Sequence, residues 1–157
     1  MMIKLNVPGV GTIHLEHVVL DVNGTLAVDG KLLPGIPGLL QELKQHLKIH
    51  LLTADTHGKQ SQMDQQLNLE AVRIQPGAEK EQKADYIHRL GSKKCAAVGQ
   101  GANDALMLEA ARIGICVISK EGTARDTLLK ADLVLPDIES ALEILQNPTR
   151  LKASLRN

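Results

Sequence analysis

The chain has 157 residues, a formal net charge of zero and a hydrophobic content of 43%, but Tyr86 is its only Phe, Tyr or Trp residue. This length fits a single domain, residues 1–157, whose core is built from aliphatic side chains and methionine. Proteins that bind single-stranded nucleic acid use aromatic stacking surfaces and a basic groove. The chain suggests neither, so we expect no nucleic-acid partner.

The sequence shows no targeting or membrane signal. Its start, Met1–Asn6, lacks the basic region, apolar core and cleavage site of a signal peptide. No run of about 18 apolar residues follows, so we expect a cytoplasmic protein without membrane association. Cys95 and Cys116 each lie in an apolar run without a CxxC spacing, which favours buried hydrophobic residues over a metal or redox pair.

The first half of the chain alternates short strands, turns and helices. Residues 3–7 and 12–20 are expected to form a hairpin whose second strand leads into Asp21. Two short apolar arms then flank Asp29–Gly30, which predicts a small flap hairpin over the same end of the sheet. The elements expected next are a helix at 37–47, a strand at 49–52, a polar helix at 59–68 and a strand at 71–74.

The second half has a more regular alternation of strands and helices. Strands are expected at 95–98, 113–118 and 133–135, and helices at 79–90, 103–112, 122–131 and from Asp137. This alternation predicts βαβ units, and hence a three-layer, Rossmann-like α/β fold with a parallel sheet flanked by helices. Pro148 is expected to end the last helix and to leave residues 149–156 as a docked helical turn.

Polar residues follow three of the predicted strands. Asp21 comes directly after a buried strand, Thr53 ends the next, and Gly99–Asp104 follows a third. On its own, Asp21 with the Asn-Gly pair behind it fits a plain turn equally well. In open α/β sheets, however, ligands bind outside the carboxyl ends of the strands, so the three ends together predict a site.

The residue types at these strand ends suit phosphoryl transfer. Asp21 can attack phosphorus, while the Thr53 hydroxyl and the Lys83 ammonium can hold phosphoryl oxygens. Asp104 can hold a magnesium ion that offsets their charge. Lys80 competes with Lys83 for its role, and Lys83 has the better motif context.

With these motifs the chain resembles the haloacid dehalogenase (HAD) superfamily, in particular the phosphorylation domain of P-type ATPases and its small, soluble, capless relatives. Asp21–Thr25 resembles the first motif, Leu51–Thr53 the second, Lys83 the third and Gly99–Asp104 the fourth. The segment between the first two motifs has no room for a cap domain or for the nucleotide domain of P-type ATPases.

The resemblance implies a role for each matching residue. Asp21 would form a phosphoaspartate, with Lys83 as the second catalytic residue. The implied phosphate-binding residues are Thr53, Ala54, Lys83 and Asn23, the implied Mg²⁺ ligands are Asp21, the Asn23 carbonyl, Gln100 and Asp104, and the auxiliary residues are Thr25 and Asn103. His57 is an alternative auxiliary base, although a surface histidine at a helix start is the commoner case.

Two residues depart from the family pattern. Asn23 stands where most phosphatases of the superfamily have a second aspartate, and an amide cannot exchange a proton near neutral pH. Gln100 stands where an aspartate commonly binds the metal, and it keeps a ligand position without its charge. We therefore expect slow hydrolysis of the phosphoenzyme and weaker metal binding.

The expected function is that of a magnesium-dependent phosphohydrolase acting on a small phosphorylated metabolite or nucleotide. Two alternatives stay open: a catalytically impaired protein that binds metal, phosphate or a partner, and a capless oligomeric sugar-phosphate phosphatase. Assembly as a homo-oligomer is a further expectation from the resemblance. A dinucleotide site at Gly99–Gly101 is disfavoured because Asp104 stands where the third glycine belongs.

Overall fold

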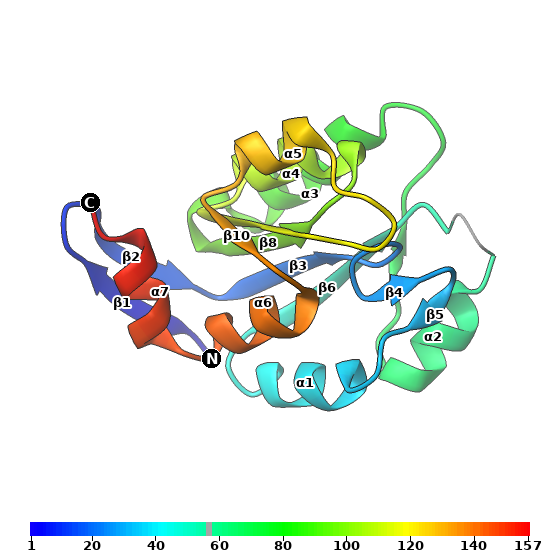
Figure 1. Ribbon diagram of the computed structural model, residues 1–157, viewed down its shortest axis with the longest axis horizontal. Coiled ribbons are helices and arrows are strands. Elements are labelled where there is room, and N and C mark those ends of the chain that lie inside the picture. Colours follow the sequence, from blue (N-terminus) through cyan, green and yellow to red (C-terminus); the bar gives the residue numbers. More distant parts are fainter. Residues whose placement is uncertain (56–57) are drawn as a thin grey trace.

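A six-stranded parallel sheet forms the middle layer of the computed structural model, which describes residues 1–55 and 58–157 (Figure 1). In chain order its strands are β3 His17–Asp21, β6 Lys48–Thr53, β7 Val72–Arg73, β8 Cys95–Gly99, β9 Ile113–Val117 and β10 Leu133–Leu135. Their order across the sheet is β10-β9-β8-β3-β6-β7. Because β3 pairs with both β8 and β6, the carboxyl ends of these three strands meet at the middle of one edge.

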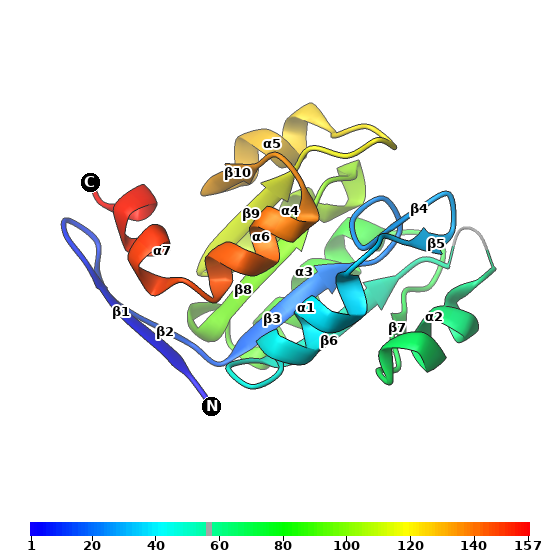
Figure 2. The same ribbon diagram turned by 60° about the horizontal axis from the view of Figure 1, so that its bottom comes forward.

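Helices cover both faces of the sheet (Figure 2). One face carries α1 Ile36–Leu43, α2 Gln60–Leu67 and α6 Ile138–Leu145, and the other carries α3 Glu79–Leu90, α4 Ala105–Ala110 and α5 Arg125–Lys130. The expected three-layer α/β fold is confirmed, and no large cap domain interrupts the described part of the chain.

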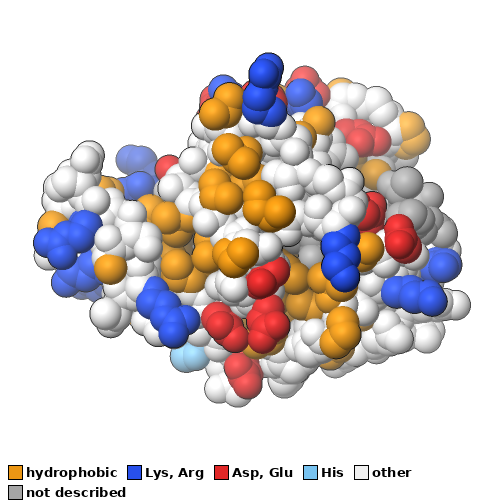
Figure 3. Space-filling model, in the orientation of Figure 1, with side chains coloured by type: hydrophobic (Ala, Val, Ile, Leu, Met, Phe, Trp, Pro, Cys, Tyr) orange, Lys and Arg blue, Asp and Glu red, His pale blue; other side chains and the backbone are white. Residues whose placement is uncertain are grey.

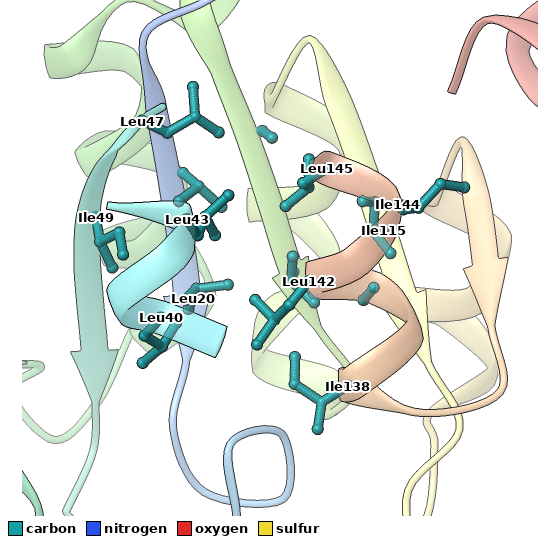
Figure 4. Packing of buried hydrophobic residues seen from close by; sticks show 14 of the residues in the cluster. Leu20, Leu40, Leu43, Leu47, Ile49, Ile115, Ile138, Leu142, Ile144 and Leu145 are labelled. Carbon is teal, nitrogen blue, oxygen red and sulfur yellow. The ribbon is translucent and has the colours of Figure 1, made fainter. Parts of the chain in front are cut away.

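Two hydrophobic clusters hold these helices on the sheet. Side chains alternate along a strand, so Leu20 of β3 belongs to the cluster under α1 and α6, whereas Val19 belongs to the cluster under α3 and α4. Figure 4 shows Leu43 of α1 and Leu142 of α6 pointing into the first cluster. All four side chains are fully buried, which stabilises the fold by about 1.5–3 kcal/mol for each.

The amino-terminal hairpin forms a separate two-stranded sheet from β1 Ile3–Val7 and β2 Gly11–Leu15. The expectation of one continuous strand at 12–20 is wrong, because Glu16 separates β2 from β3. The Glu16 N–H donates to the Lys94 carbonyl at 2.9 Å, so the chain changes hydrogen-bond partners at this residue and enters the central sheet.

Pro148 begins a new helix, because the previous one, α6, has already ended at Leu145. It occupies the first turn of α7 Pro148–Leu155, where the missing N–H of proline costs no hydrogen bond. The Asn147 side chain caps this helix by accepting a hydrogen bond from the Arg150 N–H at 3.2 Å. Leu151 is fully buried, so the carboxyl-terminal segment is a docked helix, longer than the single turn expected.

The flap hairpin is present as β4 Ala27–Val28 and β5 Lys31–Leu32. Asp29 and Gly30 have φ values of 52° and 76°, which is the geometry that a two-residue hairpin turn requires.

Three helices are shorter than expected by more than one residue at an end. The first, α1, ends at Leu43 and continues as turns to Leu47, while α4 is preceded by a 3-10 turn at Ala102–Asp104. The third, α5, begins at Arg125 because Gly122 has a φ of 96°, which is incompatible with a helix.

Charged side chains of both signs are spread over the face seen in Figure 3, with hydrophobic side chains between them. None of the helices in the described ranges is long and apolar enough to cross a membrane.

Candidate active site

Asp21 is the last residue of β3, at the middle of the carboxyl edge of the sheet. His17 and three buried apolar residues precede it in the strand. Asp21 itself is only 5% exposed. The Thr25 hydroxyl, from the turn after β3, donates a hydrogen bond to Asp21 Oδ2 at 2.9 Å. The turn therefore fixes the orientation of the carboxylate.

Lys83 joins Asp21 to a second carboxylate. Its Nζ lies 2.8 Å from Asp21 Oδ1 and 2.8 Å from Asp104 Oδ1, and its side chain is fully buried. Lys80, one turn earlier on α3, is directed to the surface, where its Nζ lies 3.8 Å from Asp126. The structure thus brings Lys83, and not Lys80, to the candidate site.

Asp104 is held by backbone groups of the loop after β8. Its Oδ2 accepts hydrogen bonds from the N–H groups of Gln100 at 3.0 Å and Gly101 at 3.1 Å. A Cβ atom on Gly99 would lie 2.6 Å from the Asp104 carboxyl group, so only glycine permits this approach. Asn103 lies nearby, with its Oδ1 3.4 Å from Lys83 Nζ.

Thr53 and Asn23 contact each other across the ends of β6 and β3. Thr53 Oγ1 accepts hydrogen bonds from Asn23 Nδ2 at 3.1 Å and from the Asp55 N–H at 2.8 Å. Asn23 Oδ1 is buried and has no hydrogen-bond partner among the described residues. Ala54 is half-buried at the same strand end.

Gln100 makes a contact that its predicted role as a metal ligand does not include. Its side-chain Nε2 donates a hydrogen bond to the backbone carbonyl of Asn23 at 3.1 Å. Both groups were predicted to bind Mg²⁺, and in the structure they bind each other.

Burial and the charge of Asp104 raise the pKa of Asp21 to about 7, and the ion pair with Lys83 opposes this only in part. Burial lowers the pKa of Lys83, but the charges of Asp21 and Asp104 outweigh burial and raise it above its usual value. One ammonium therefore faces two carboxylates. A further cation beside Asp21 would favour its ionised, nucleophilic form.

The donor set fits Mg²⁺ with a reduced number of charges. Asp21, Asp104 and the Asn23 carbonyl offer the hard oxygen atoms that Mg²⁺ prefers, and this ion commonly keeps several waters. Within residues 1–55 and 58–157, no group of three or more His, Cys, Asp or Glu side chains could hold a metal ion. The acids of the site are Asp21 and Asp104, and Gln100 stands where the family pattern has a further aspartate.

The loop after β9 contacts the turn after β3 and the flap hairpin, through residues that the sequence motifs did not reveal. Ser119 Oγ donates to the Gly24 carbonyl at 2.5 Å, and Glu121 Oε2 accepts a hydrogen bond from the Asp29 N–H at 3.1 Å. This loop therefore ties the flap hairpin to the sheet. The only sequence signal for this loop is that it follows a predicted strand, as the motif loops do. His57, considered as an auxiliary base, lies outside the described residues.

The family model of the haloacid dehalogenase-like hydrolases matches residues 2–112 of the chain. An uncharacterised protein of Methanocaldococcus jannaschii is 44% identical over 85 residues, which are 52% of this chain and 91% of that protein. A probable copper-exporting P-type ATPase of Archaeoglobus fulgidus is 30% identical over 131 residues, which are 78% of this chain but only 16% of the ATPase.

Solved structures show the same fold. A 3-deoxy-D-manno-octulosonate 8-phosphate phosphatase from Moraxella catarrhalis, in complex with magnesium, phosphate and KDO, superposes with a TM-score of 0.70 at 17% identity, covering 85% of this chain and 87% of that one. The catalytic domain of the CPx-ATPase CopB-B gives a TM-score of 0.60 at 25% identity, covering 74% of this chain and 46% of that one.

Proposed function

Since the chain belongs to the haloacid dehalogenase-like hydrolase family, we propose that it is a magnesium-dependent phosphohydrolase with Asp21 as nucleophile. The observation that carries this proposal is the position of Lys83 between Asp21 and Asp104, with all three side chains buried at the carboxyl edge of the sheet. A purely structural ion pair would need only one acid for its lysine.

In the first step, an oxygen of Asp21 attacks phosphorus, and the bond from phosphorus to the leaving oxygen breaks with its electron pair on that oxygen. Lys83 and the Thr53 hydroxyl offset and bind the negative phosphoryl oxygens. Asp21, the Asn23 carbonyl and Asp104 would hold Mg²⁺, which would supply further positive charge for these oxygens.

Asn23 supports the phosphoryl site in a second way. Its Nδ2 donates to Thr53 Oγ1 at 3.1 Å, and the Asp55 N–H donates to the same oxygen at 2.8 Å. Because both bonds use the hydroxyl as an acceptor, the Thr53 proton stays free to donate to a phosphoryl oxygen.

The second step, hydrolysis of the phosphoaspartate, lacks its usual general base. Such a base contributes about 10²- to 10⁴-fold to the rate, and Asn23 cannot replace it. The phosphoenzyme is therefore long-lived, and turnover is slow. The proposed substrates are small phosphorylated metabolites or nucleotides.

The proposal is tested by incubating the protein with Mg²⁺ and either acetyl phosphate or p-nitrophenyl phosphate. Wild type should gain the mass of one phosphoryl group in a form that hydroxylamine removes, whereas Asp21→Asn should not. Asp85→Asn, which replaces an exposed acid on α3, is the matched control and should behave as wild type. Equal turnover by wild type and Asp21→Asn would refute the proposal.

A second candidate function is a binding protein that holds phosphate or metal without turnover. The hydrogen bond between Gln100 and the Asn23 carbonyl favours it, because that bond occupies a proposed metal ligand. Beryllofluoride binding without any phosphoenzyme would support this candidate against the hydrolase. A capless sugar-phosphate phosphatase ranks third, because it would need an acid at Asn23.

A further inference from the structure

The backbone carbonyl of Asn23 is the contact point between the predicted metal site and the side chain of Gln100. A carbonyl oxygen only accepts hydrogen bonds, so the amide must present its nitrogen to it. A metal ion and an N–H donor compete for the lone pairs that the carbonyl directs toward the site. We propose that Gln100 is a positioning residue that competes with Mg²⁺ for the Asn23 carbonyl and thereby limits the metal affinity of the proposed hydrolase site.

The space for this contact is built into the loop after β3. A Cβ atom on Gly24 would lie 2.0 Å from Gln100 Nε2, so the glycine leaves the room that the amide occupies. Gly24 has a φ of 82°, and its N–H donates to the Ala27 carbonyl at 2.7 Å. The turn is therefore held in the conformation that presents the Asn23 carbonyl to Gln100.

The backbone of Gln100 is fixed from both sides. Its N–H donates to Asp104 Oδ2 at 3.0 Å, and its carbonyl accepts a hydrogen bond from the Ala124 N–H at 2.9 Å. The residue is only 7% exposed. Only the side chain is thus free to move, and metal binding at the Asn23 carbonyl requires the amide to release it. An aspartate at this position would attract the metal and could not donate to the carbonyl.

The direction in which one substitution changes the Mg²⁺ affinity distinguishes competition from ligation by Gln100. If Gln100 competes, Gln100→Ala frees the carbonyl and tightens Mg²⁺ binding by about two- to tenfold, the equivalent of one hydrogen bond. If Gln100 instead binds the metal through Oε1, the same substitution weakens binding. Titration calorimetry of the protein with MgCl₂ alone measures this difference. Gln41→Ala, at an exposed position of α1, should bind as wild type.

Equal or weaker Mg²⁺ binding by Gln100→Ala would overturn the inference, as would the lack of Mg²⁺ binding by both proteins. Should this variant fail to fold, NMR of glutamine-labelled wild type gives an independent test, with Gln100→Glu to assign the side-chain signal. Saturation with MgCl₂ should shift the Gln100 amide protons and speed their exchange with water, and unchanged signals would contradict the release. Neither experiment involves a phosphorylated substrate, so a protein that never forms a phosphoenzyme can still pass both.

Discussion

Two polar clusters pack on the same face of the central sheet, and they differ in whether charged partners offset the effect of burial. The carboxyl-end cluster consists of Asp21, Lys83 and Asp104, and the amino-end cluster consists of His17, His50 and Tyr86. Helix α3 contributes to both, through Lys83 to the first and through Tyr86, three residues later, to the second.

The amino-end cluster is a chain of neutral groups. His17 Nδ1 lies 3.1 Å from His50 Nε2, and His50 Nδ1 lies 2.8 Å from the Tyr86 hydroxyl. Burial lowers the pKa of both histidines, that of His50 to about 4. Neutral imidazoles can each donate once and accept once, so these groups satisfy one another.

The comparison shows what distinguishes a candidate site from a buried polar network. At the amino end burial outweighs the charge of Glu16, the acid beside His17, and keeps the imidazoles neutral. At the carboxyl end Lys83 faces two acids and stays charged, so charge is available for a ligand. Burial of polar residues alone would not have told the two apart.

Removing the cation of the carboxyl-end cluster should have the largest effect. Lys83→Met leaves two buried carboxylates without a cation, so we expect no phosphoenzyme and a loss of about 3 kcal/mol in the free energy of unfolding. Urea unfolding measures the loss. Lys80→Met removes only an exposed pair with Asp126 and should cost less than about 0.5 kcal/mol. Equal stability of the two variants would contradict the claim that the buried Lys83, and not the exposed Lys80, neutralises the two acids.

Adding an acid to the same cluster should sharpen the contrast. Asn23→Asp supplies a group that can accept a proton from water, so the phosphoenzyme should decay about a hundredfold faster. The decay is followed by mass spectrometry after removal of the phosphoryl donor. Asn6→Asp, on the exposed side of β1, serves as the control for added charge. A decay rate unchanged by Asn23→Asp would argue against a missing base as the limit.

Forcing a charge onto the amino-end cluster should have the smallest effect. The pKa of His50 is about 4 in the folded protein and 6.5 in the unfolded reference, so acid favours unfolding. The contribution of neutral His50 to the free energy of unfolding is complete above about pH 6.5 and is lost as the pH is lowered toward about 4. We expect a loss of about 1–2 kcal/mol in the free energy of unfolding, less than the full pKa difference would give, because solvent screens the charge of the half-buried His50.

Urea unfolding at about pH 7.5 and 4.5 tests this expectation. His50→Asn should lose less stability between the two pH values than wild type, while His46→Asn, at an exposed position, should lose as much as wild type. An identical loss in wild type and His50→Asn would show that His50 does not contribute to the pH dependence of stability.

The sheet and the convergence of Asp21, Thr53, Lys83 and Asp104 could be predicted from the sequence. Alternating strands and helices specify a parallel sheet, and parallel strands bring their carboxyl ends to one edge. The break at Glu16 could not be predicted, because no turn residue marks it and it depends on backbone hydrogen bonds to the distant residues Lys94 and Lys48.

Contacts between segments far apart in the sequence could not be predicted either. Gln100 and Asn23 are 77 residues apart, and nothing in either motif indicates that one would donate to the other. The amino-end cluster joins three elements whose polar residues match no pattern of spacing. Such contacts depend on the packed positions of strands and helices, which periodicity does not specify.

Tyr86 gives the molecule a built-in optical probe. The chain has no tryptophan and no other tyrosine, so its near-ultraviolet fluorescence comes from this one ring. The ring contacts His50 and lies beneath the guanidinium of Arg89, 5.5 Å from the ring centroid. It also shares α3 with Lys83. Emission from the unmodified protein therefore reports any shift of α3 that accompanies a ligand binding at the opposite end of the sheet.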